Sequence, residues 1–280
     1  MRNARLDFRP TSGALGVEIH GVDLAQPLED GTVAEIRAAL AEQGVVFFRD
    51  QKLTPEQHIA FAERFAVINI NRFFKTALGY PQVAEVRKEP DQKKNIGGSW
   101  HTDHSYDQIP ALGSILLARE VPERGGDTLF ASMALAYEAL SDGLKQTLAS
   151  LKAVHSSRHV FGAKAAYKIA TGERLGNTDL ATQDAVHPVI IRHPESGRKT
   201  LYVNPGFTTH FDGWTAEESK PLLDYLYAHA GRPEFQTRFQ WREGSIAFWD
   251  NRATWHFAIN DYHGDRRLMH RITLEGVPVS

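Results

Sequence analysis

The 280-residue chain contains no cysteine. This absence excludes disulfides, zinc–thiolate sites, iron–sulfur clusters and cysteine nucleophiles. Any bound metal must therefore be held by histidine, aspartate or glutamate, with water or a small ligand completing the coordination shell. The opening residues have no apolar stretch of signal-peptide length, and no run approaches the length of a membrane span. A cytoplasmic location is the expectation.

An excess of charge of one sign is also missing. The 32 basic residues nearly balance the 34 acidic ones, which gives a formal net charge of −2. No basic cluster is longer than Lys93-Lys94 or Arg266-Arg267, so the chain offers no groove that could track phosphates. The balance likewise gives no general attraction to an acidic membrane surface. We therefore expect small-molecule partners, and neither nucleic acid nor membrane.

Neither internal repeats nor low-complexity linkers divide the chain, so we expect one domain over residues 1–280. Near the start, residues 14–24 alternate apolar and polar side chains, as a half-buried strand does. A helix is predicted from about Thr32 to Gln43, with Asp30 as its cap and Gly44 as its stop. Thr54, followed by proline and by Gln57 three residues later, predicts a second capped helix start.

The rest of the chain reads mostly as short strands. They are predicted at 45–50, 83–89, 114–120, 127–133, 189–193, 199–204, 245–251 and 269–276. Helical spacing interrupts them at about 134–151 and 215–230. Residues 162–186 are polar and irregular, which is typical of a disordered insertion or of a lid over a site. This pattern favours a mainly β fold with helical insertions (α+β), a double-stranded β-helix or jelly roll.

The stretch GGSWHTDHSY, residues 97–106, places two histidines and an aspartate within four positions. On an extended strand, residues i and i+2 project to the same face, so His101 and Asp103 would present an imidazole beside a carboxylate. With one more histidine from a distant strand they would complete a facial two-histidine, one-carboxylate triad. Such a triad leaves three adjacent positions open on an octahedral iron(II).

Accidental pairs of this kind are common, so context has to separate them. With roughly one residue in eight acidic, thirteen histidines predict one or two His-x-Asp/Glu pairs by chance. The sequence holds four, at His101-Asp103, His193-Glu195, His210-Asp212 and His263-Asp265. The pairs at 193 and 263 lie in turn-like segments, and the pair at 210 runs into a helix start. The first pair is therefore the favoured metal site, and His210-Asp212 is the next candidate.

Four separated motifs resemble one enzyme family. They are WHTDHSY, GGDTLFAS, WDNRATWHFA and RRLMHRITLEG, and their order and spacing are similar to those of the taurine dioxygenase (TauD/TfdA) family. That family consists of iron(II)- and 2-oxoglutarate-dependent dioxygenases. The resemblance implies that His101, Asp103 and His256 ligate iron(II). It also implies that Thr128 and Arg267 bind the distal carboxylate of the cosubstrate 2-oxoglutarate.

The last predicted strand adds an argument from physics. If it is extended, Arg267, Met269 and Arg271 share one face, and Arg266 and His270 share the other. Two guanidinium groups that converge on one cavity repel each other unless anions accompany them, and a guanidinium fork suits a carboxylate or a sulfo group. By resemblance, Arg271 faces an anionic group of the substrate.

The predicted substrate pocket departs from that of the taurine enzymes. Their histidine and tyrosine after the second helix fall on Asn71 and Phe74 here, and their asparagine before the metal motif falls on Gly97. These changes remove hydrogen-bond donors, which argues against taurine itself. His104 stands beside the predicted iron where relatives have a small apolar residue.

Two further positions complete the pocket expectation. Phe161 and Phe207 match apolar pocket positions of the family, and Phe74 adds a third ring. Three phenylalanines with one arginine suit an amphipathic anion with an aromatic or aliphatic body. The candidates are sulfonates, sulfate esters and aryloxy or alkyl carboxylates.

The resemblance implies hydroxylation with O2, release of succinate and CO2, and often C–S or C–O cleavage. Relatives often assemble, so a homodimer or homotetramer is expected. Two alternatives stay open at this point. A metal-dependent hydrolase could use the same triad, although no glutamate within the motifs could serve as its general base. A non-catalytic jelly-roll binding protein could use the histidines structurally.

Overall fold

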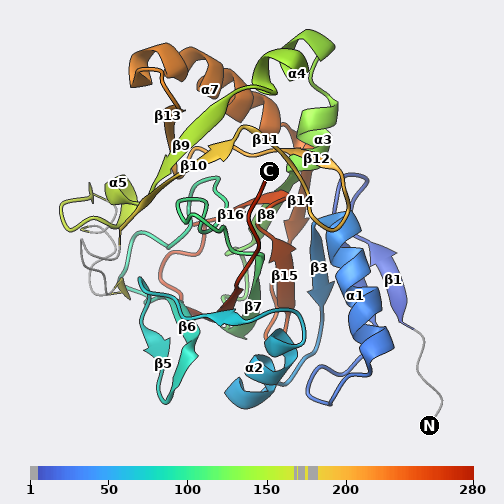
Figure 1. Ribbon diagram of the computed structural model, residues 1–280. Helices are drawn as coiled ribbons and strands as arrows, with labels where there is room; N and C mark the ends of the chain where they lie inside the picture. The colour runs from blue at the N-terminus through green and yellow to red at the C-terminus, as the bar shows by residue number, and fades with distance from the viewer. Residues whose placement is uncertain (1–5, 167–168, 170–173, 176–181) are drawn as a thin grey trace.

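A computed structural model describes residues 6–166, 169, 174–175 and 182–280 (Figure 1). Its largest sheet has the strand order β1-β2-β3-β15-β7-β17-β6-β5, with β4 paired to β17. All but one of its strand pairs are antiparallel within the described residues; β2 and β3 are parallel. The bounds are β1 Asp7–Pro10, β2 Val17–His20, β3 Val45–Phe48, β4 Ile68–Asn69, β5 Thr76–Ala77, β6 Tyr80–Lys88, β7 Gly113–Glu120, β15 Ile246–Asp250 and β17 Arg267–Leu274.

Smaller sheets form the opposing layer. Their orders are β14-β8-β16, β10-β9-β13 and β11-β12. Phe47 on β3 and Trp249 on β15 pack their rings against Phe130 on β8, at centroid distances of 5.6 and 5.7 Å. The bounds are β8 Thr128–Ser132, β9 Lys152–Ser156, β10 Asp184–Pro188, β11 Ile190–Arg192, β12 Lys199–Leu201, β13 Thr208–Phe211, β14 Gln236–Phe239 and β16 Thr254–Ala258. The predicted mainly β, two-layer jelly-roll fold is confirmed.

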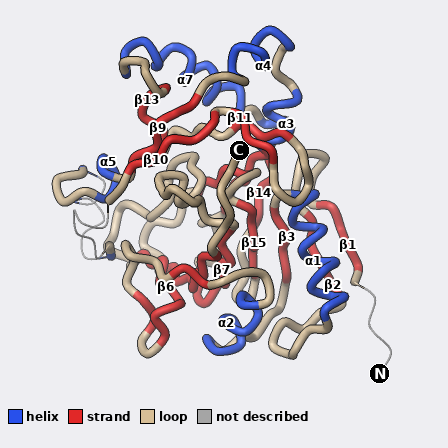
Figure 2. Tube along the Cα trace, in the orientation of Figure 1, coloured by secondary structure: helices blue, strands red, loops and turns tan. Residues whose placement is uncertain are grey.

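Helices cover the outer faces of both layers (Figures 1 and 2). Helices α1 and α2 pack on the large sheet, where Ile36 and Phe61 join the same buried cluster as Phe248. Helices α3, α4 and α7 cover the smaller sheets. The bounds are α1 Asp30–Gln43, α2 Pro55–Glu63, α3 Met133–Glu138, α4 Asp142–Leu148, α5 Arg158–Phe161, α7 Ala216–Ala230 and a 3-10 turn at Pro233–Phe235. Among the described residues, no helix combines the length and apolar character that a membrane span requires.

Capping chemistry sets several helix boundaries. The capping box of Thr54 and Gln57 is present as predicted, and Gly44 ends α1 with a φ of 71°. Asp30 is not the cap of α1, because the helix already begins there and Glu29 precedes it. The helix predicted over 134–151 is wrong in its continuity. Ser141 accepts a hydrogen bond from Leu144 N and so starts α4 as a separate helix after α3.

Other strand predictions were incomplete. The strand expected over 127–133 ends at Ser132, whose side chain caps α3. The short strands β9, β13, β14 and β16 were not predicted as separate elements.

Of the expected lid at 162–186, the structure describes residues 162–166, 169, 174–175 and 182–186, so that expectation lies partly outside the described residues.

A fully buried histidine on α2 gives the fold an acid sensitivity. Burial, with His270 and Arg119 nearby, lowers the pKa of His58 to about 3. Between the ordinary histidine pKa near 6.5 and this value, the unfolded chain binds a proton that the folded chain does not. Stability is therefore lost as pH falls through this window. We expect His58→Leu to reduce the slope of unfolding free energy against pH by about 1.4 kcal/mol per pH unit.

Denaturant unfolding between pH 6.5 and 4 would measure this slope. The exposed His263 supplies the control, because His263→Gln should leave the slope as it is in the unaltered protein. A His58→Leu variant with an unchanged slope would show that this imidazole does not resist protonation in the folded state.

Candidate metal centre and adjoining cavity

Two distant segments of the chain meet backbone to backbone at His101 and His256. His101 N donates to His256 O at 3.1 Å, and His256 N donates to His101 O at 2.8 Å. This isolated antiparallel bridge joins the segment after β6 to strand β16. Residues directly opposite one another in such a bridge point their side chains to the same side. The two imidazole rings accordingly lie 4.0 Å apart between centroids.

Asp103 reaches the histidines by a different route from the predicted one. The segment is not an extended strand: residues 103–106 form a turn, and His104 has a φ of 58°. The turn brings the carboxylate back toward both rings. Asp103 Oδ1 lies 3.8 Å from His101 Nε2, and Asp103 Oδ2 lies 3.8 Å from His256 Nε2. The pair therefore converges as expected, but through a turn and not through strand alternation.

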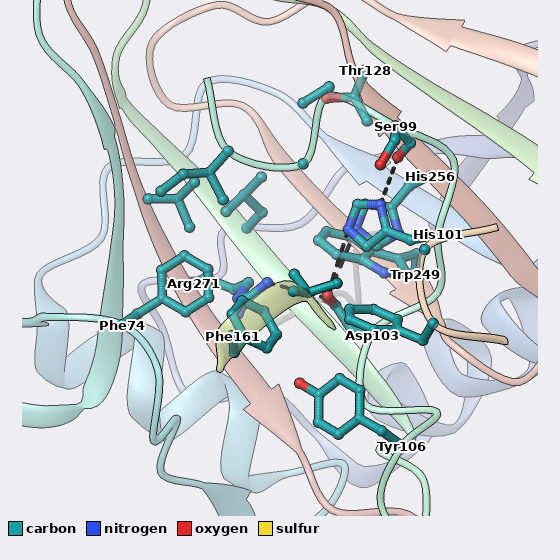
Figure 3. A pocket seen from close by; sticks show the side chains of 18 of the residues that line it. Phe74, Ser99, His101, Asp103, Tyr106, Thr128, Phe161, Trp249, His256 and Arg271 are labelled. Atoms are coloured by element: carbon teal, nitrogen blue, oxygen red, sulfur yellow. Dashed lines mark hydrogen bonds and ion pairs between the residues drawn. The ribbon is translucent and has the colours of Figure 1, made fainter. Parts of the chain in front are cut away.

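The donor set fits a divalent metal. One ligand atom from each of His101, Asp103 and His256 lies within 4.8 Å of the others. The His101 Nδ1 atom is 2.7 Å from Ser99 O, so when Nδ1–H donates to this carbonyl the Nε2 lone pair faces the carboxylate (Figure 3). Two neutral imidazoles and one carboxylate with vacant space beside them are the ligands of non-haem iron and of related divalent metals.

Electrostatics favour the ligating protonation states. Burial lowers the pKa of His101, and it lowers the pKa of His256 well below the usual value, so both rings are neutral at pH 7. For Asp103, burial alone would raise the pKa. Arg271 and the neighbouring histidines outweigh that effect and hold the pKa below its ordinary value, so the carboxylate is ionised. Ser114 Oγ donates to Asp103 Oδ2 at 3.2 Å and helps to orient it.

Arg267 and Thr128 lie together in the same cavity. Arg267 is 5% exposed, and its Nε and Nη2 atoms have no hydrogen-bond partner in the described part of the chain. Thr128 Oγ1 accepts a hydrogen bond from Trp241 Nε1 at 2.9 Å, which leaves the hydroxyl hydrogen available to donate. A buried guanidinium with unused donors is a site for an anion.

Arg271 is the second cavity arginine. Its Nη1 atom donates to Asp103 Oδ2 at 3.2 Å, and its guanidinium lies 4.5 Å from the centroid of the Phe74 ring. The Nε atom is buried without a partner among the described residues. Arg266, by contrast, points to the other face of β17 and pairs with Glu89 and Glu120. The predicted division of the two faces of this strand agrees with the structure.

The cavity beside the three ligands has a volume of about 270 Å³. The ligands, Thr128 and both arginines line its polar side. Figure 3 shows the rings of Phe74 and Phe161 beside Arg271, and Tyr106 below Asp103. The apolar wall consists of Phe74, Val86, Ile96, Leu116, Val160, Phe161 and Phe207.

Asn71 and His104 do not line the cavity, so the structure does not support direct substrate contact for them. Asn71 Oδ1 accepts from the backbone nitrogens of Phe73 and Phe74, and its Nδ2 lies 3.3 Å from His104 Nε2. His104 Nδ1 in turn lies 2.9 Å from Asp107 Oδ2. The two residues form a polar layer behind Phe74 that fixes the turn carrying this ring.

Sequence reasoning missed several residues of the site. Tyr106, Ser99 and Trp249 line the cavity, and Ser114 supports Asp103 from β7. Tyr106 and Ser99 were within reach of prediction, because both belong to the GGSWHTDHSY stretch. Ser114 lies in an ordinary strand pattern, and only the pairing of β7 with β15 and β17 places it beside the carboxylate.

The other His-x-Asp/Glu pairs lie elsewhere. His193 is buried and its Nε2 atom is 2.9 Å from Asp250 Oδ2, so it is a structural histidine of the core. His210 lies beside Thr209 on β13, with its Nδ1 atom 2.8 Å from the hydroxyl oxygen. In the part of the chain that the structure describes, His101, Asp103 and His256 are the one group of three side chains placed to hold a metal.

The fold and site together define a jelly-roll protein with a group of three side chains that fits a divalent metal. The family model described as "Taurine catabolism dioxygenase TauD, TfdA family" matches residues 7–273. The chain belongs to this family, and it is a 2-oxoglutarate-dependent dioxygenase. The family resemblance drawn from the four motifs is thereby confirmed.

Similar proteins include three with informative names. An alkylsulfatase from Acinetobacter baylyi is 37% identical over 97% of this chain and 86% of its own length. An alpha-ketoglutarate-dependent sulfate ester dioxygenase from Pseudomonas putida is 34% identical over 98% of this chain and 91% of its own. The crystal structure of a taurine dioxygenase from Burkholderia xenovorans has a TM-score of 0.82 and is 38% identical, over 97% of this chain and 89% of that one.

Proposed function

We propose that this dioxygenase uses iron(II) and hydroxylates a small anionic organic molecule, namely a sulfonate, a sulfate ester or an aryloxy or alkyl carboxylate. One observation carries the proposal: three side chains placed to hold a metal and two buried arginines with unused donors line a single cavity. Two anion sites beside one metal site suit one dianionic cosubstrate and one anionic substrate.

Each residue has a defined task in this proposal. His101, Asp103 and His256 hold the metal, and Arg267 and Thr128 hold the distal carboxylate of 2-oxoglutarate. When bound, the metal and 2-oxoglutarate supply the oxidising chemistry with O2, which releases succinate and CO2. The protein fixes the positions of both groups and excludes water from the cavity.

The substrate would lie between Arg271 and the metal ligands. The Nε side of Arg271 is free for an anion because Nη1 is held by Asp103. The rings of Phe74, Phe161 and Phe207 would contact an aliphatic or aromatic body and shield it from water. Relatives named for sulfate esters support this class of substrate.

Hydroxylation would release the anionic group in some of these substrates. A carbon that bears both a new hydroxyl and a sulfate, a sulfonate or an aryl ether oxygen loses that group and becomes a carbonyl. Arg271 would hold the departing anion of a sulfate or a sulfonate, or the retained carboxylate of an aryloxy acid that releases its phenol, and so orient the C–H bond beside that anion toward the metal. The proposed products are therefore an aldehyde or ketone together with sulfate, sulfite or, from an aryl ether, the phenol.

Substrate-dependent succinate release tests the proposal. Purified protein with iron(II), 2-oxoglutarate and O2 is expected to form succinate at least tenfold faster with one of these anions than without it. The matched neutral alcohol is the control and should not stimulate. Release of the anionic group at an unchanged rate after O2 is removed would instead support the metal-dependent hydrolase.

Three further expectations stay predictions. Residues 1–280 are proposed to form one domain, supported by a family match from 7 to 273 and by a sheet that contains both β1 and β17. The homodimer or homotetramer and the cytoplasmic location are predicted from the sequence and its resemblance alone.

A further inference from the structure

Tyr106 lines the cavity, and the proposed binding of the metal and of 2-oxoglutarate does not use its side chain. It closes the turn that begins at Asp103, and it is 2% exposed. Its ring packs edge-on against Phe207 at 4.7 Å and against Phe73 at 5.9 Å. It also meets Phe161 at 6.1 Å between centroids. These contacts fix the ring, so the position of its hydroxyl is set by packing.

The Tyr106 hydroxyl has no hydrogen bond within the described residues, although the side chain lines the cavity. Figure 3 shows it on the side of the ring that faces the space beneath Phe161. A phenylalanine would keep the same ring contacts, so packing alone does not require the hydroxyl. The hydroxyl is thus available to a molecule that enters the cavity.

The hydroxyl would act as a donor. Burial raises the pKa of Tyr106 well above its usual value, and the carboxylates of Asp107 and Asp103 raise it further. The phenol is therefore protonated at any working pH. Arg271 lines the same cavity as Tyr106.

We propose that Tyr106 determines specificity for a sulfo group, by donating a hydrogen bond to the third oxygen of a substrate group whose other two oxygens Arg271 holds. The inference rests on the proposed function and narrows its substrate class. Tyr106 would contact substrate, and it would not take part in holding the metal or 2-oxoglutarate.

The geometry of the anion explains the selectivity. A guanidinium fork binds two oxygens of an anion in its own plane. A carboxylate has only these two oxygens. A tetrahedral sulfo group has a third, which projects out of that plane and needs its own donor. A site with one guanidinium edge and one separate phenol therefore suits a sulfate ester or a sulfonate better than a carboxylate.

The test compares Tyr106→Phe with Tyr202→Phe. The Tyr202 hydroxyl is buried without a hydrogen-bond partner in the described part of the chain, but Tyr202 does not line the cavity. Each protein is assayed for succinate release with hexyl sulfate, 1-hexanesulfonate and heptanoate, whose chains are similar. Substrate-free turnover of 2-oxoglutarate and thermal unfolding are measured beside them.

We expect Tyr106→Phe to raise KM for the sulfo substrates about tenfold and to change KM for heptanoate less than twofold. Tyr202→Phe should leave substrate-free 2-oxoglutarate turnover unchanged, and Tyr106→Phe should not melt below the wild-type temperature, because its ring contacts remain. Tyr202→Phe should leave all three KM values unchanged. If KM rises for hexyl sulfate alone, the site accepts sulfate esters. If KM rises for 1-hexanesulfonate as well, the site accepts sulfonates too.

The remaining outcomes overturn the inference in distinguishable ways. An equal effect of Tyr106→Phe on all three substrates, or no effect, overturns the selectivity while the proposed function stands. If the wild-type protein turns over heptanoate and neither sulfo compound, the selectivity is likewise overturned and the proposed function stands. If no anion of the screen stimulates or binds to the wild-type protein, the proposed function falls and the inference falls with it.

Discussion

Replacing His101 with alanine is expected to reduce 2-oxoglutarate turnover by at least about 1000-fold, both with and without substrate. His101 is one of the three side chains proposed to hold the metal, and its Nδ1 contact with Ser99 O orients the ring. Loss of an orienting neighbour alone lowers metal affinity by about 10–100-fold, so loss of a ligand should exceed that. Succinate formation and Mn(II) binding by equilibrium dialysis measure the two effects separately.

His210→Ala is the matched control. His210 belongs to the second-best His-x-Asp pair, yet it lies on β13 beside Thr209 and outside the metal group. This variant should keep full metal affinity and turnover. If the His101 variant kept wild-type activity and the His210 variant lost it, the metal centre would lie at His210-Asp212 and the assignment to His101 would be refuted.

Replacing Arg267 with alanine should raise KM for 2-oxoglutarate about 100-fold. The side chain is buried, and its Nε and Nη2 donors have no partner within the described residues, so a carboxylate placed there would form a desolvated, charge-assisted pair. Removal of one partner of such a pair weakens binding strongly. Steady-state kinetics against 2-oxoglutarate, at a saturating substrate concentration, give the value.

Arg266 is the control that shows whether the effect on KM comes from the position of Arg267 or only from loss of a positive charge. Arg266 pairs with Glu89 and Glu120 on the opposite face of β17, and Arg266→Ala should change this KM less than twofold.

Arg267→Met tests the proposed anion site through the stability of the fold. Because an unpaired buried cation destabilises the fold, the methionine variant should melt at a temperature no lower than the wild type in the absence of 2-oxoglutarate. A marked drop would mean that Arg267 holds the fold together.

Local chemistry explains which parts of the fold could be predicted from sequence. The capping box at Thr54 and the left-handed Gly44 are signals contained within four residues, and both were read correctly. Ser132 and Ser141 are equally local signals, but helical spacing on both sides concealed them. Short strands such as β9 and β14 depend on pairing with distant strands, which no local pattern reports.

The candidate site shows the same division. Motif order predicted which three side chains would come together, but it did not predict their geometry: Asp103 lies on a turn with His104 at a positive φ. His104 and Asn71 were placed in the pocket by alignment, but hydrogen bonds direct them to the backbone of Phe74 and to Asp107. A polar side chain that can satisfy itself locally need not face the ligand, and this choice is made by three-dimensional contacts.

The hydrogen-bonded bridge between His101 and His256 has one more consequence. It joins two stretches that are far apart along the chain, which are also linked where Ala258 N donates to Gly97 O at 2.9 Å and Asn95 Nδ2 donates to Ala258 O at 2.8 Å. An ion shared by their imidazoles would bind only when the two stretches lie together, and it would stabilise that arrangement by mass action. Chelation should therefore first release the chain between β6 and β7 from the β14-β8-β16 layer, which makes proteolysis near residue 100 a direct indicator of metal loading.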